Sequence, residues 1–259
     1  MKEKICKKYD VVIVGGGVSG VCAAIASSRH GAKTALIQNR PVLGGNASSE
    51  IRMHICGADH HGSRPDARET GILEEILLEN RRRNHNHSFS ILDSVMWEKV
   101  KFQEGLDLFL NTHMYEAVTQ NDKIKSISCV QLTTEKEFAF EADIFMDATG
   151  DGTLAALSGA EFMVGREGKS VFGEQYAPDV SDNVTMGNTL MFKAVDIGKP
   201  APFVKPFWAN TYTEEDLAGR DHESFTSGYW WIELGGDELD IIADGEELRD
   251  ELLKVVYGI

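Results

Sequence analysis

A chain of 259 residues can bury a large core, and its 42% hydrophobic and 26% charged residues are ordinary usage for a globular protein. The formal net charge of −15 argues against a nucleic-acid-binding surface, which needs a basic stripe, and against binding to anionic membranes. The charged N-terminal segment has no signal-peptide core, and no apolar run approaches the length of a membrane span. We therefore expect a cytoplasmic protein.

The first predicted element is a buried parallel strand at residues 9–14, which runs into a glycine-rich turn and then a helix. The turn has the spacing G-x-G-x-x-G, with its glycines at Gly15, Gly17 and Gly20. The first glycine of this spacing permits the tight turn, the second lets the backbone approach a pyrophosphate, and the third lets helix and strand pack closely. The N-terminus of the helix then binds the anion. This segment predicts a nucleotide-binding unit.

The second predicted strand, residues 34–37, ends where such units bind ribose. An acidic residue is expected there, about twenty positions after the glycines. This chain instead has Gln38, followed by Asn39 and Arg40. A glutamine oxygen can accept one hydroxyl hydrogen bond without charge assistance, whereas Arg40 suggests a 2′-phosphate and hence NADP. The choice of nucleotide stays open at this point.

Two later motifs resemble FAD-dependent oxidoreductases of the glutathione reductase-like structural class. Arg40 with Gly44 and Gly45 is similar to the arginine, spacer and glycine pair after the second strand, and residues 147–152 (D-A-T-G-D-G) resemble the later A-T-G-D element. The resemblance implies that FAD is the cofactor and that the chain is an oxidoreductase. The chain further resembles a bacterial group of FAD-dependent oxidoreductases at residues 44–54, 68–72, 186–190 and 229–233.

The resemblance implies an α/β fold, with a Rossmann-like FAD-binding domain of parallel sheet plus antiparallel meander at residues 1–160. Residues 51–105 are predicted to form an insertion with helices at 69–83 and 91–103. Short strands are predicted in the meander region, with a turn at Asn121 and Asp122. These strands are expected at residues 106–111, 114–119, 124–133 and 138–140.

Residues 161–259 are expected to begin a mixed α+β substrate domain, with strands at 189–194 and 229–234 and a helix at 245–257. Because related proteins look longer, we expect this chain to be C-terminally truncated. It would then hold the adenine and pyrophosphate half of the FAD site and lack part of the flavin site and substrate pocket.

The resemblance also implies which residues contact FAD. Val118 is included because relatives contact adenine from the meander backbone, and Ser48 lies towards the flavin ring with Glu50, Arg52 and His54. The expected cofactor-binding residues are Gly15, Gly17, Gly20, Gln38, Asn39, Arg40, Gly44, Gly45, Ser48, Val118, Ala148, Thr149, Gly150 and Asp151.

Three residues after the second glycine pair are candidates for catalysis. His54 can donate or accept a proton beside the flavin because imidazole titrates near physiological pH, although a histidine in such a loop more often only makes a local hydrogen bond. Arg52 can bind a substrate carboxylate or stabilise reduced flavin, or form a surface salt bridge. Cys56 is either a redox partner of the flavin or a packed thiol.

Neither cysteines nor histidines indicate a metal or disulfide site. The four cysteines show no C-x-x-C spacing. No cysteine or carboxylate completes a recognised ligand spacing with the histidines, so no metal is predicted. The histidines considered are His54, His60, His61, His85 and His87.

These observations predict an FAD-dependent oxidoreductase that acts on an unidentified small organic substrate by hydride transfer to or from the flavin. One alternative is an NAD(P)-dependent dehydrogenase, which the missing acidic residue and Arg40 favour and the later FAD motifs oppose. The other alternative is a non-catalytic nucleotide-binding fragment.

Overall fold

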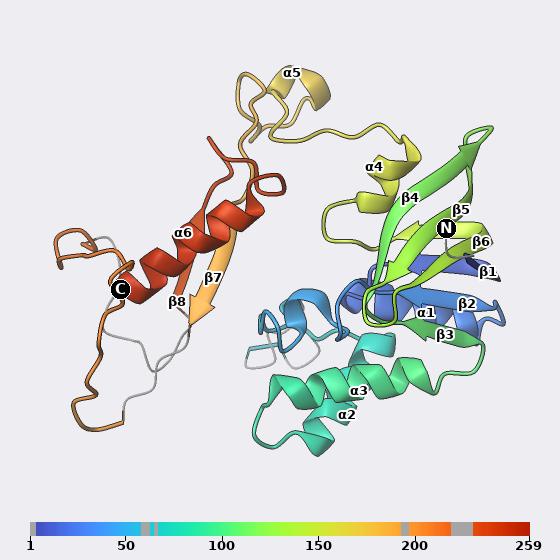
Figure 1. Ribbon diagram of the computed structural model, residues 1–259, viewed down its shortest axis with the longest axis horizontal. Helices are drawn as coiled ribbons and strands as arrows, with labels where there is room; N and C mark the ends of the chain where they lie inside the picture. The colour runs from blue at the N-terminus through green and yellow to red at the C-terminus, as the bar shows by residue number, and fades with distance from the viewer. Residues whose placement is uncertain (1–3, 58–62, 65–66, 193–196, 219–229) are drawn as a thin grey trace. The chain divides into compact units, whose positions relative to one another are not determined.

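The computed structural model describes residues 4–57, 63–64, 67–192, 197–218 and 230–259. The chain forms two compact units, Met1–Phe162 and Met163–Ile259, each with a sheet of its own (Figure 1). The predicted boundary between an FAD-binding and a substrate domain falls at residue 160, and the roles of the two units stay predictions.

The first unit is built on a six-stranded sheet with the order β3-β2-β1-β6-β5-β4. The first four of these strands are parallel, whereas β5 pairs antiparallel with both β6 and β4. This mixed sheet confirms the predicted Rossmann-like α/β class. The strands are β1 (Ile5–Val14), β2 (Thr34–Ile37), β3 (Leu106–Phe109), β4 (Thr112–Gln120), β5 (Lys123–Gln131) and β6 (Lys136–Asp147).

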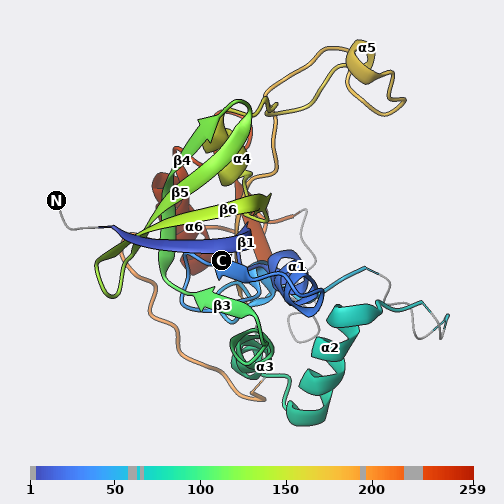
Figure 2. The same ribbon diagram turned by 90° about the vertical axis from the view of Figure 1, so that its right-hand side faces the viewer.

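Each face of the parallel strands is covered by different elements. One face packs against helices α1 (Val18–Arg29) and α3 (Phe89–Lys101). Helix α2 (Gly71–Arg83) packs on these two helices, and Figure 2 shows all three on one side of the sheet. Ile13 and Leu36 point to this side, among Val21, Ile25 and Met96. Alternation along the strands sends the neighbouring side chains to the opposite face.

The opposite face is covered by the antiparallel strands and by helix α4 (Thr153–Ser158). Val12 and Ile37 pack there against Ile127, Phe140 and Leu154, which are all nearly fully buried. Because parallel strands end at one edge of the sheet, the loops after β1, β2 and β6 meet at that edge. This edge is where a ligand is expected.

The structure corrects two predictions about the strands. The run at 106–111 was expected in the antiparallel meander, but β3 instead pairs parallel with β2, with Phe109 opposite Ile37. The run at 138–140 was expected as a separate short strand, but it is only the start of β6, which continues to Asp147. The hydrophobic pattern hides this continuation because the exposed Glu141 and Asp143 interrupt it.

The turn predicted at Asn121 and Asp122 is confirmed. It joins β4 to β5, and the two residues have φ angles of 51° and 56°, in the left-handed region. Two-residue hairpin turns of this kind need positive φ at both positions, which asparagine and aspartate tolerate better than most residues.

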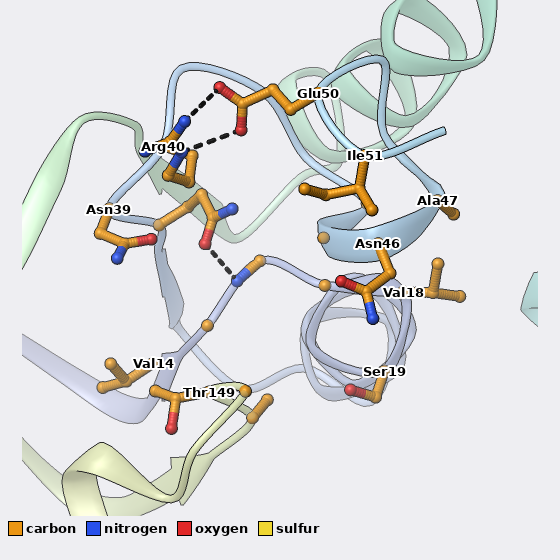
Figure 3. Close-up of a pocket in the computed structure, with 18 of the residues that line it drawn as sticks. Val14, Val18, Ser19, Asn39, Arg40, Asn46, Ala47, Glu50, Ile51 and Thr149 are labelled. Atoms are coloured by element: carbon orange, nitrogen blue, oxygen red, sulfur yellow. Dashed lines mark hydrogen bonds and ion pairs between the residues drawn. The ribbon is translucent and has the colours of Figure 1, made fainter. Parts of the chain in front are cut away.

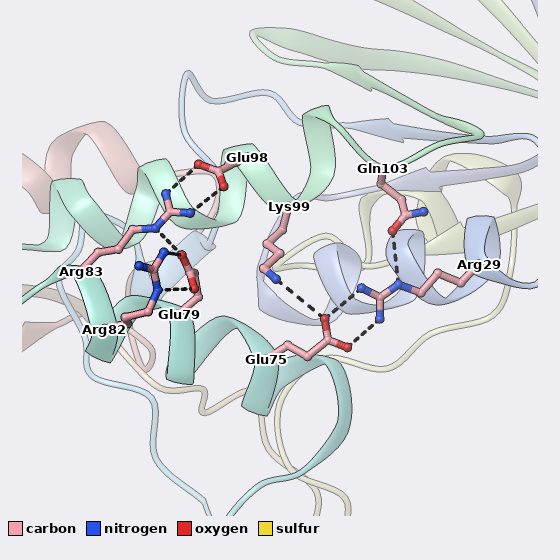
Figure 4. A network of polar contacts seen from close by, with 8 residues as sticks. All are labelled: Arg29, Glu75, Glu79, Arg82, Arg83, Glu98, Lys99 and Gln103. Atoms are coloured by element: carbon pink, nitrogen blue, oxygen red, sulfur yellow. Dashed lines mark hydrogen bonds and ion pairs between the residues drawn. The ribbon is translucent and has the colours of Figure 1, made fainter.

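Charged residues pair across the outer surfaces of α1, α2 and α3 (Figure 4). Arg29 on α1 makes two hydrogen bonds to Glu75 on α2, of 2.7 and 2.9 Å. Arg83, at the end of α2, makes two 2.7 Å hydrogen bonds to Glu98 on α3 and also pairs with Glu79. Exposed pairs of this kind contribute little stability each. They give Arg82 and Arg83 at the end of α2 partners within the protein.

The second unit contains a two-stranded antiparallel sheet and a C-terminal helix. Strands β7 (Asn188–Phe192) and β8 (Trp230–Leu234) pair, and α6 (Gly245–Gly258) packs against both. Leu248 and Leu252 on α6 are buried. A short helix, α5 (Lys169–Phe172), precedes this sheet. Of the predicted strands here, residues 193–194 and 229 lie outside the described residues.

None of the helices in the described part of the chain has the length and hydrophobicity of a membrane span. Likewise, the described residues contain no cluster of three or more histidine, cysteine, aspartate or glutamate side chains arranged to hold a metal ion. Of the histidines considered as ligands, His60 and His61 lie outside the described residues.

Candidate functional site

A cavity of about 810 Å³ lies at the edge of the first unit where β1, β2 and β6 end (Figure 3). Its volume is in the range of about 300–1,000 Å³ that is usual for ligand pockets. Segments that are far apart in the sequence surround it. The cavity is lined by residues 14–19, 37–40, 44–47, 50–51, 53–55, 112–114, 148–151 and 153.

The glycine loop after β1 is held between the two neighbouring strands. The N–H of Gly15 donates a 2.8 Å hydrogen bond to the carbonyl oxygen of Ile37 in β2, and the N–H of Ala148 donates one of 2.8 Å to Val14. Gly15 has a φ of +106°, and a Cβ at this position would collide with the carbonyl of Ala148. Only glycine therefore allows this turn to lie against the loop after β6.

The start of α1 at Gly17 is open towards the cavity. Gly17 is the N-cap of α1, and within the described residues no side chain caps this end. A Cβ on Gly17 would have no described atom within 4 Å, so the backbone here is accessible to a ligand from the cavity. Val18 and Ser19 in the first turn also line the cavity. The free N–H groups and the helix dipole at such an end favour a phosphate.

Gly20 does not line the cavity. Its Cβ would collide with the carbonyl oxygen of Gly15, so this glycine allows α1 to pack closely on the loop that precedes it. This contact matches the packing role expected for the third glycine.

The second glycine pair is hydrogen-bonded to the first glycine loop. The N–H of Gly44 donates a 2.8 Å hydrogen bond to the carbonyl of Gly16, and Gly17 and Gly44 form an isolated parallel bridge. Gly44 has a φ of +110°, and a Cβ there would strike the end of the buried Met96 side chain. The chain then forms a short 3₁₀ turn at Gly45–Ala47. This turn is the wall of the cavity opposite the loop after β6.

The side chain of Gln38 is used inside the protein. Its Oε1 accepts a 2.9 Å hydrogen bond from the N–H of Gly16, and its Nε2 donates one of 3.2 Å to the carbonyl of Val42. Only 6% of the residue is exposed. Gln38 lines the cavity, but it supports the glycine loop rather than presenting a free acceptor to a ribose hydroxyl.

Arg40 also has an internal partner. Its Nε and Nη2 donate hydrogen bonds of 2.9 and 2.8 Å to the two carboxylate oxygens of Glu50 (Figure 3). The hydrogen bonds to Glu50 raise the pKa of Arg40 above its ordinary value. The arginine that suggested a 2′-phosphate is therefore already neutralised by a carboxylate.

The loop after β6 is organised by Asp147. Its Oδ1 accepts hydrogen bonds from the N–H and hydroxyl of Thr149, of 2.9 and 2.7 Å, and its Oδ2 accepts one of 2.9 Å from the N–H of Ala155. The Thr149 hydroxyl in turn accepts a 2.8 Å hydrogen bond from the N–H of Thr153. Burial raises the pKa of the Asp147 carboxyl, but these hydrogen bonds outweigh it and place the pKa below its ordinary value.

Replacing Asp147 with asparagine is expected to lower the free energy of unfolding by about 1–3 kcal/mol at neutral pH, because an amide nitrogen cannot accept from Ala155. The folded-state pKa is depressed, so the stabilisation is complete above the unfolded pKa of about 3.9 and is lost as pH falls through the folded pKa. Urea unfolding of both proteins between neutral pH and about pH 3 checks this. The difference should be constant down to about pH 4 and shrink below it.

The matched control is Asp143→Asn, which makes the same change at an exposed position on the same strand. It is expected to change stability by less than about 0.5 kcal/mol. Equal effects of the two substitutions would show that the Asp147 network does not hold the loop.

Several expected cofactor residues lie where the prediction placed them. The structure brings them together around one cavity, although their individual contacts with a cofactor stay predictions. The predicted residues that line the cavity are Gly15, Gly17, Gln38, Asn39, Arg40, Gly44, Gly45, Ala148, Thr149, Gly150 and Asp151.

Two other predicted cofactor residues do not line it. Ser48 is only 1% exposed, and its hydroxyl accepts a 3.3 Å hydrogen bond from the N–H of Glu50. Val118 lies further along β4, and the part of that strand that reaches the cavity is Thr112–Met114. The part of the meander that lines the cavity therefore lies four to six residues earlier in the chain than Val118.

Of the three catalytic candidates, only His54 lines the cavity. Arg52 is exposed, has a φ of 65°, and donates a 3.0 Å hydrogen bond to the carbonyl of Ser49. Cys56 is exposed, and its thiol lies 3.8 Å from the carbonyl oxygen of His54. The structure does not bring these two side chains to the cavity together with His54.

The cavity also contains residues that the sequence reasoning missed. Thr112, His113 and Met114 follow β3 after a short turn, and the G-x-G-x-x-G motif itself contains Gly16. The glycine-pair motif could have indicated its neighbour Asn46. The others carried no signal beyond position: Val14, Val18, Ser19, Ile37, Ala47, Ile51, Met53, Ile55 and Thr153.

A family model described as "FAD dependent oxidoreductase" matches residues 10–231. Among curated proteins, the cytochrome fumarate reductase of Shewanella frigidimarina is 55% identical over 38 residues, which are 15% of this chain. The chain spans only 7% of the length of that relative in this match.

Several solved structures are also similar to this chain. The structure titled Thermovibrio ammonificans THI4 is 21% identical, with 67% of this chain and 76% of that chain covered and a TM-score of 0.44. The L-proline dehydrogenase from P. horikoshii is 20% identical, with 58% and 24% covered and a TM-score of 0.35. The flavin-dependent monooxygenase PieE, in complex with FAD and substrate, is 16% identical, with 62% and 34% covered and a TM-score of 0.42.

Proposed function

Because this chain belongs to the family of FAD-dependent oxidoreductases, we propose that it binds FAD in the cavity of its first unit and uses it to oxidise or reduce a small organic molecule. One observation carries the proposal. The loop at Gly15–Gly17 is hydrogen-bonded to Gly44 on one side and lies against Ala148 on the other, so three separate backbone segments enclose one cavity.

The residues present fit a dinucleotide. Gly17 leaves the uncapped start of α1 open, and a diphosphate there would accept hydrogen bonds from the first N–H groups of the helix. The adenosine end would be held at Asn39, beside Gln38 and close to Thr112–Met114 of β4. The flavin end would lie towards His54 and the loop that Asp147 organises.

Bound FAD supplies the hydride or electron chemistry, and the protein contributes binding, orientation and electrostatics. Residues 51 and 55 are isoleucines that line the cavity and flank His54 in the sequence. The imidazole of His54 is the titratable side chain we assign to proton transfer with the substrate. Arg52 and Cys56 have no part in this proposal because neither lines the cavity.

The NAD(P)-dependent alternative loses its main support in the structure. It depended on Arg40 as a ligand for a 2′-phosphate, and the guanidinium is bound to Glu50 on two of its N–H groups. It also depended on the absence of an acidic residue at Gln38, whose side chain instead supports the glycine loop.

The first experiment is to purify the chain, record its visible absorption spectrum, and identify any released cofactor by mass. We expect flavin bands in the spectrum and FAD in the extract. Oxidisable small molecules such as hydroxy acids, amino acids and amines are then added anaerobically, and one of these classes of compound should bleach the flavin bands. A protein that is colourless and ignores added FAD would contradict the proposal. The non-catalytic alternative would be favoured by bound FAD that fails two tests. None of these molecules would bleach its bands, and after chemical reduction no added electron acceptor would reoxidise it.

A further inference from the structure

The end of β2 is the place where nucleotide-binding units of this kind distinguish one adenosine ribose from another. A carboxylate at this position binds the two ribose hydroxyls, whereas an arginine nearby accommodates a 2′-phosphate. This chain has no carboxylate at the position and does have an arginine, at Arg40. The residue types alone would therefore indicate a site for a phosphorylated ribose.

The contacts of Gln38 remove it from this choice. Both polar atoms of its amide have partners within the protein, at 2.9 Å on Gly16 and 3.2 Å on Val42. A ribose hydroxyl could use Gln38 only by breaking a buried hydrogen bond to the glycine loop, which costs free energy. The choice between the two riboses therefore falls to the neighbouring side chains.

Glu50 is held where it can occupy Arg40. Its backbone N–H donates to the Ser48 hydroxyl at 3.3 Å, and the N–H of Ser49 donates to Asp93 on α3 at 3.0 Å. Asp93 is only 8% exposed, so this loop is tied to the buried side of α3. From this loop the carboxylate of Glu50 takes two hydrogen bonds from Arg40, and both side chains line the cavity (Figure 3).

A 2′-phosphate near Arg40 would meet two penalties. The guanidinium would have to leave a planar bidentate pair with Glu50, whose geometry is more favourable than that of an ordinary exposed ion pair. The phosphate would also bring its negative charge close to the Glu50 carboxylate, and like charges at short range repel. Discrimination by an unfavourable contact with the wrong ligand is a common way for sites to be selective.

We propose that Glu50 is a specificity-determining residue, which holds Arg40 and so excludes dinucleotides with a 2′-phosphate on the adenosine ribose. The site then accepts adenosine with free ribose hydroxyls, as FAD has. This inference rests on the proposed function, because it requires the adenosine end of the ligand to lie at the end of β2.

The test measures the affinities of the unchanged protein and of Glu50→Gln for two probes, ADP-ribose and 2′-phospho-ADP-ribose, by titration calorimetry. FAD binding to the unchanged protein is measured in the same way. The unchanged protein should prefer ADP-ribose by about tenfold or more. Glu50→Gln should bind 2′-phospho-ADP-ribose about tenfold more tightly than the unchanged protein does, because Arg40 is released from a charged partner. The double variant Arg40→Ala, Glu50→Gln should lose this gain.

Glu141→Gln is the matched control, since it removes one negative charge at an exposed position of β6 that does not line the cavity. It should keep the preference of the unchanged protein. If Glu50→Gln binds ADP-ribose but gains nothing for the phosphorylated probe, or loses both probes, the inference is overturned while FAD binding by the unchanged protein still supports the proposed function. If the unchanged protein binds neither FAD nor ADP-ribose, both proposals fail.

Discussion

Replacing Gly17 with valine is expected to weaken FAD binding by about 100-fold while the protein stays folded. Gly17 has an ordinary φ of −63°, and a Cβ there would meet no described protein atom within 4 Å, so the protein backbone tolerates a side chain that branches at this atom. The same side chain would fill the space in which the backbone approaches the diphosphate. FAD titration measures the affinity, and circular dichroism with urea unfolding checks the fold.

A smaller substitution at the same residue gives the series its internal control. Gly17→Ala adds one carbon and should weaken FAD binding by about tenfold, less than valine does. Affinity for FAD that is unchanged in Gly17→Val would show that no diphosphate lies against this residue. A loss of FAD binding together with a loss of folded structure would show that Gly17 is constrained by the protein and not by a ligand.

Replacing Gly15 with alanine is expected to destabilise the fold itself, by about 3–5 kcal/mol. The residue has a φ of +106°, and its Cβ would collide with the backbone of Ala148, which cannot rotate away as a side chain can. Any relief would stretch the hydrogen bonds from Gly15 to Ile37 and from Ala148 to Val14. Urea unfolding monitored by circular dichroism measures the loss.

The matched control is again Gly17→Ala, the same substitution two residues later, which should change stability by less than about 1 kcal/mol. Failure to obtain folded Gly15→Ala under conditions that yield folded Gly17→Ala agrees with the expectation. Equal stability of the two variants would show that the glycine loop does not lie against the loop after β6 as described.

Features of the fold that depend on local pattern were predictable. The strand, glycine turn and helix at the start of the chain are encoded within about twenty residues, and the turn at Asn121 and Asp122 is encoded in two. The two helices of the insertion were expected at 69–83 and 91–103, and they run from Gly71 to Arg83 and from Phe89 to Lys101. Periodicity and turn chemistry act over short distances in the sequence, which is why they could be read directly.

Features that depend on long-range pairing were not predictable. Nothing within the run at 106–109 shows that its partner is the parallel β2 rather than β4. The register of β4 against β5 shifts between Met114 and Glu116 and again between Val118 and Thr119, so the strand position that reaches the cavity could not be counted from the sequence. A bulge adds a residue to one strand and changes which residues face a given point.

The site shows the same division. The glycines of the cavity follow from known motif spacings, but the side chains beside them do not. Gln38 was expected to accept from ribose, and its acceptor is taken by Gly16, 22 residues away in the sequence. Arg40 suggested a binding site for a 2′-phosphate, but in the structure it is paired with Glu50. Which of several possible partners a polar side chain takes is decided by the folded geometry, and residue type alone does not report it.

Hydrogen–deuterium exchange of the whole chain, with and without saturating FAD and analysed by mass spectrometry, tests the central claim most directly. FAD bound in the cavity should slow exchange in peptides that cover residues 14–20, 38–47, 112–114 and 148–153, and leave α6 and the pair β7 and β8 unchanged. Protection that is confined to the second unit, or absent at the glycine loop while FAD is bound, would contradict the assignment of this cavity as the FAD site.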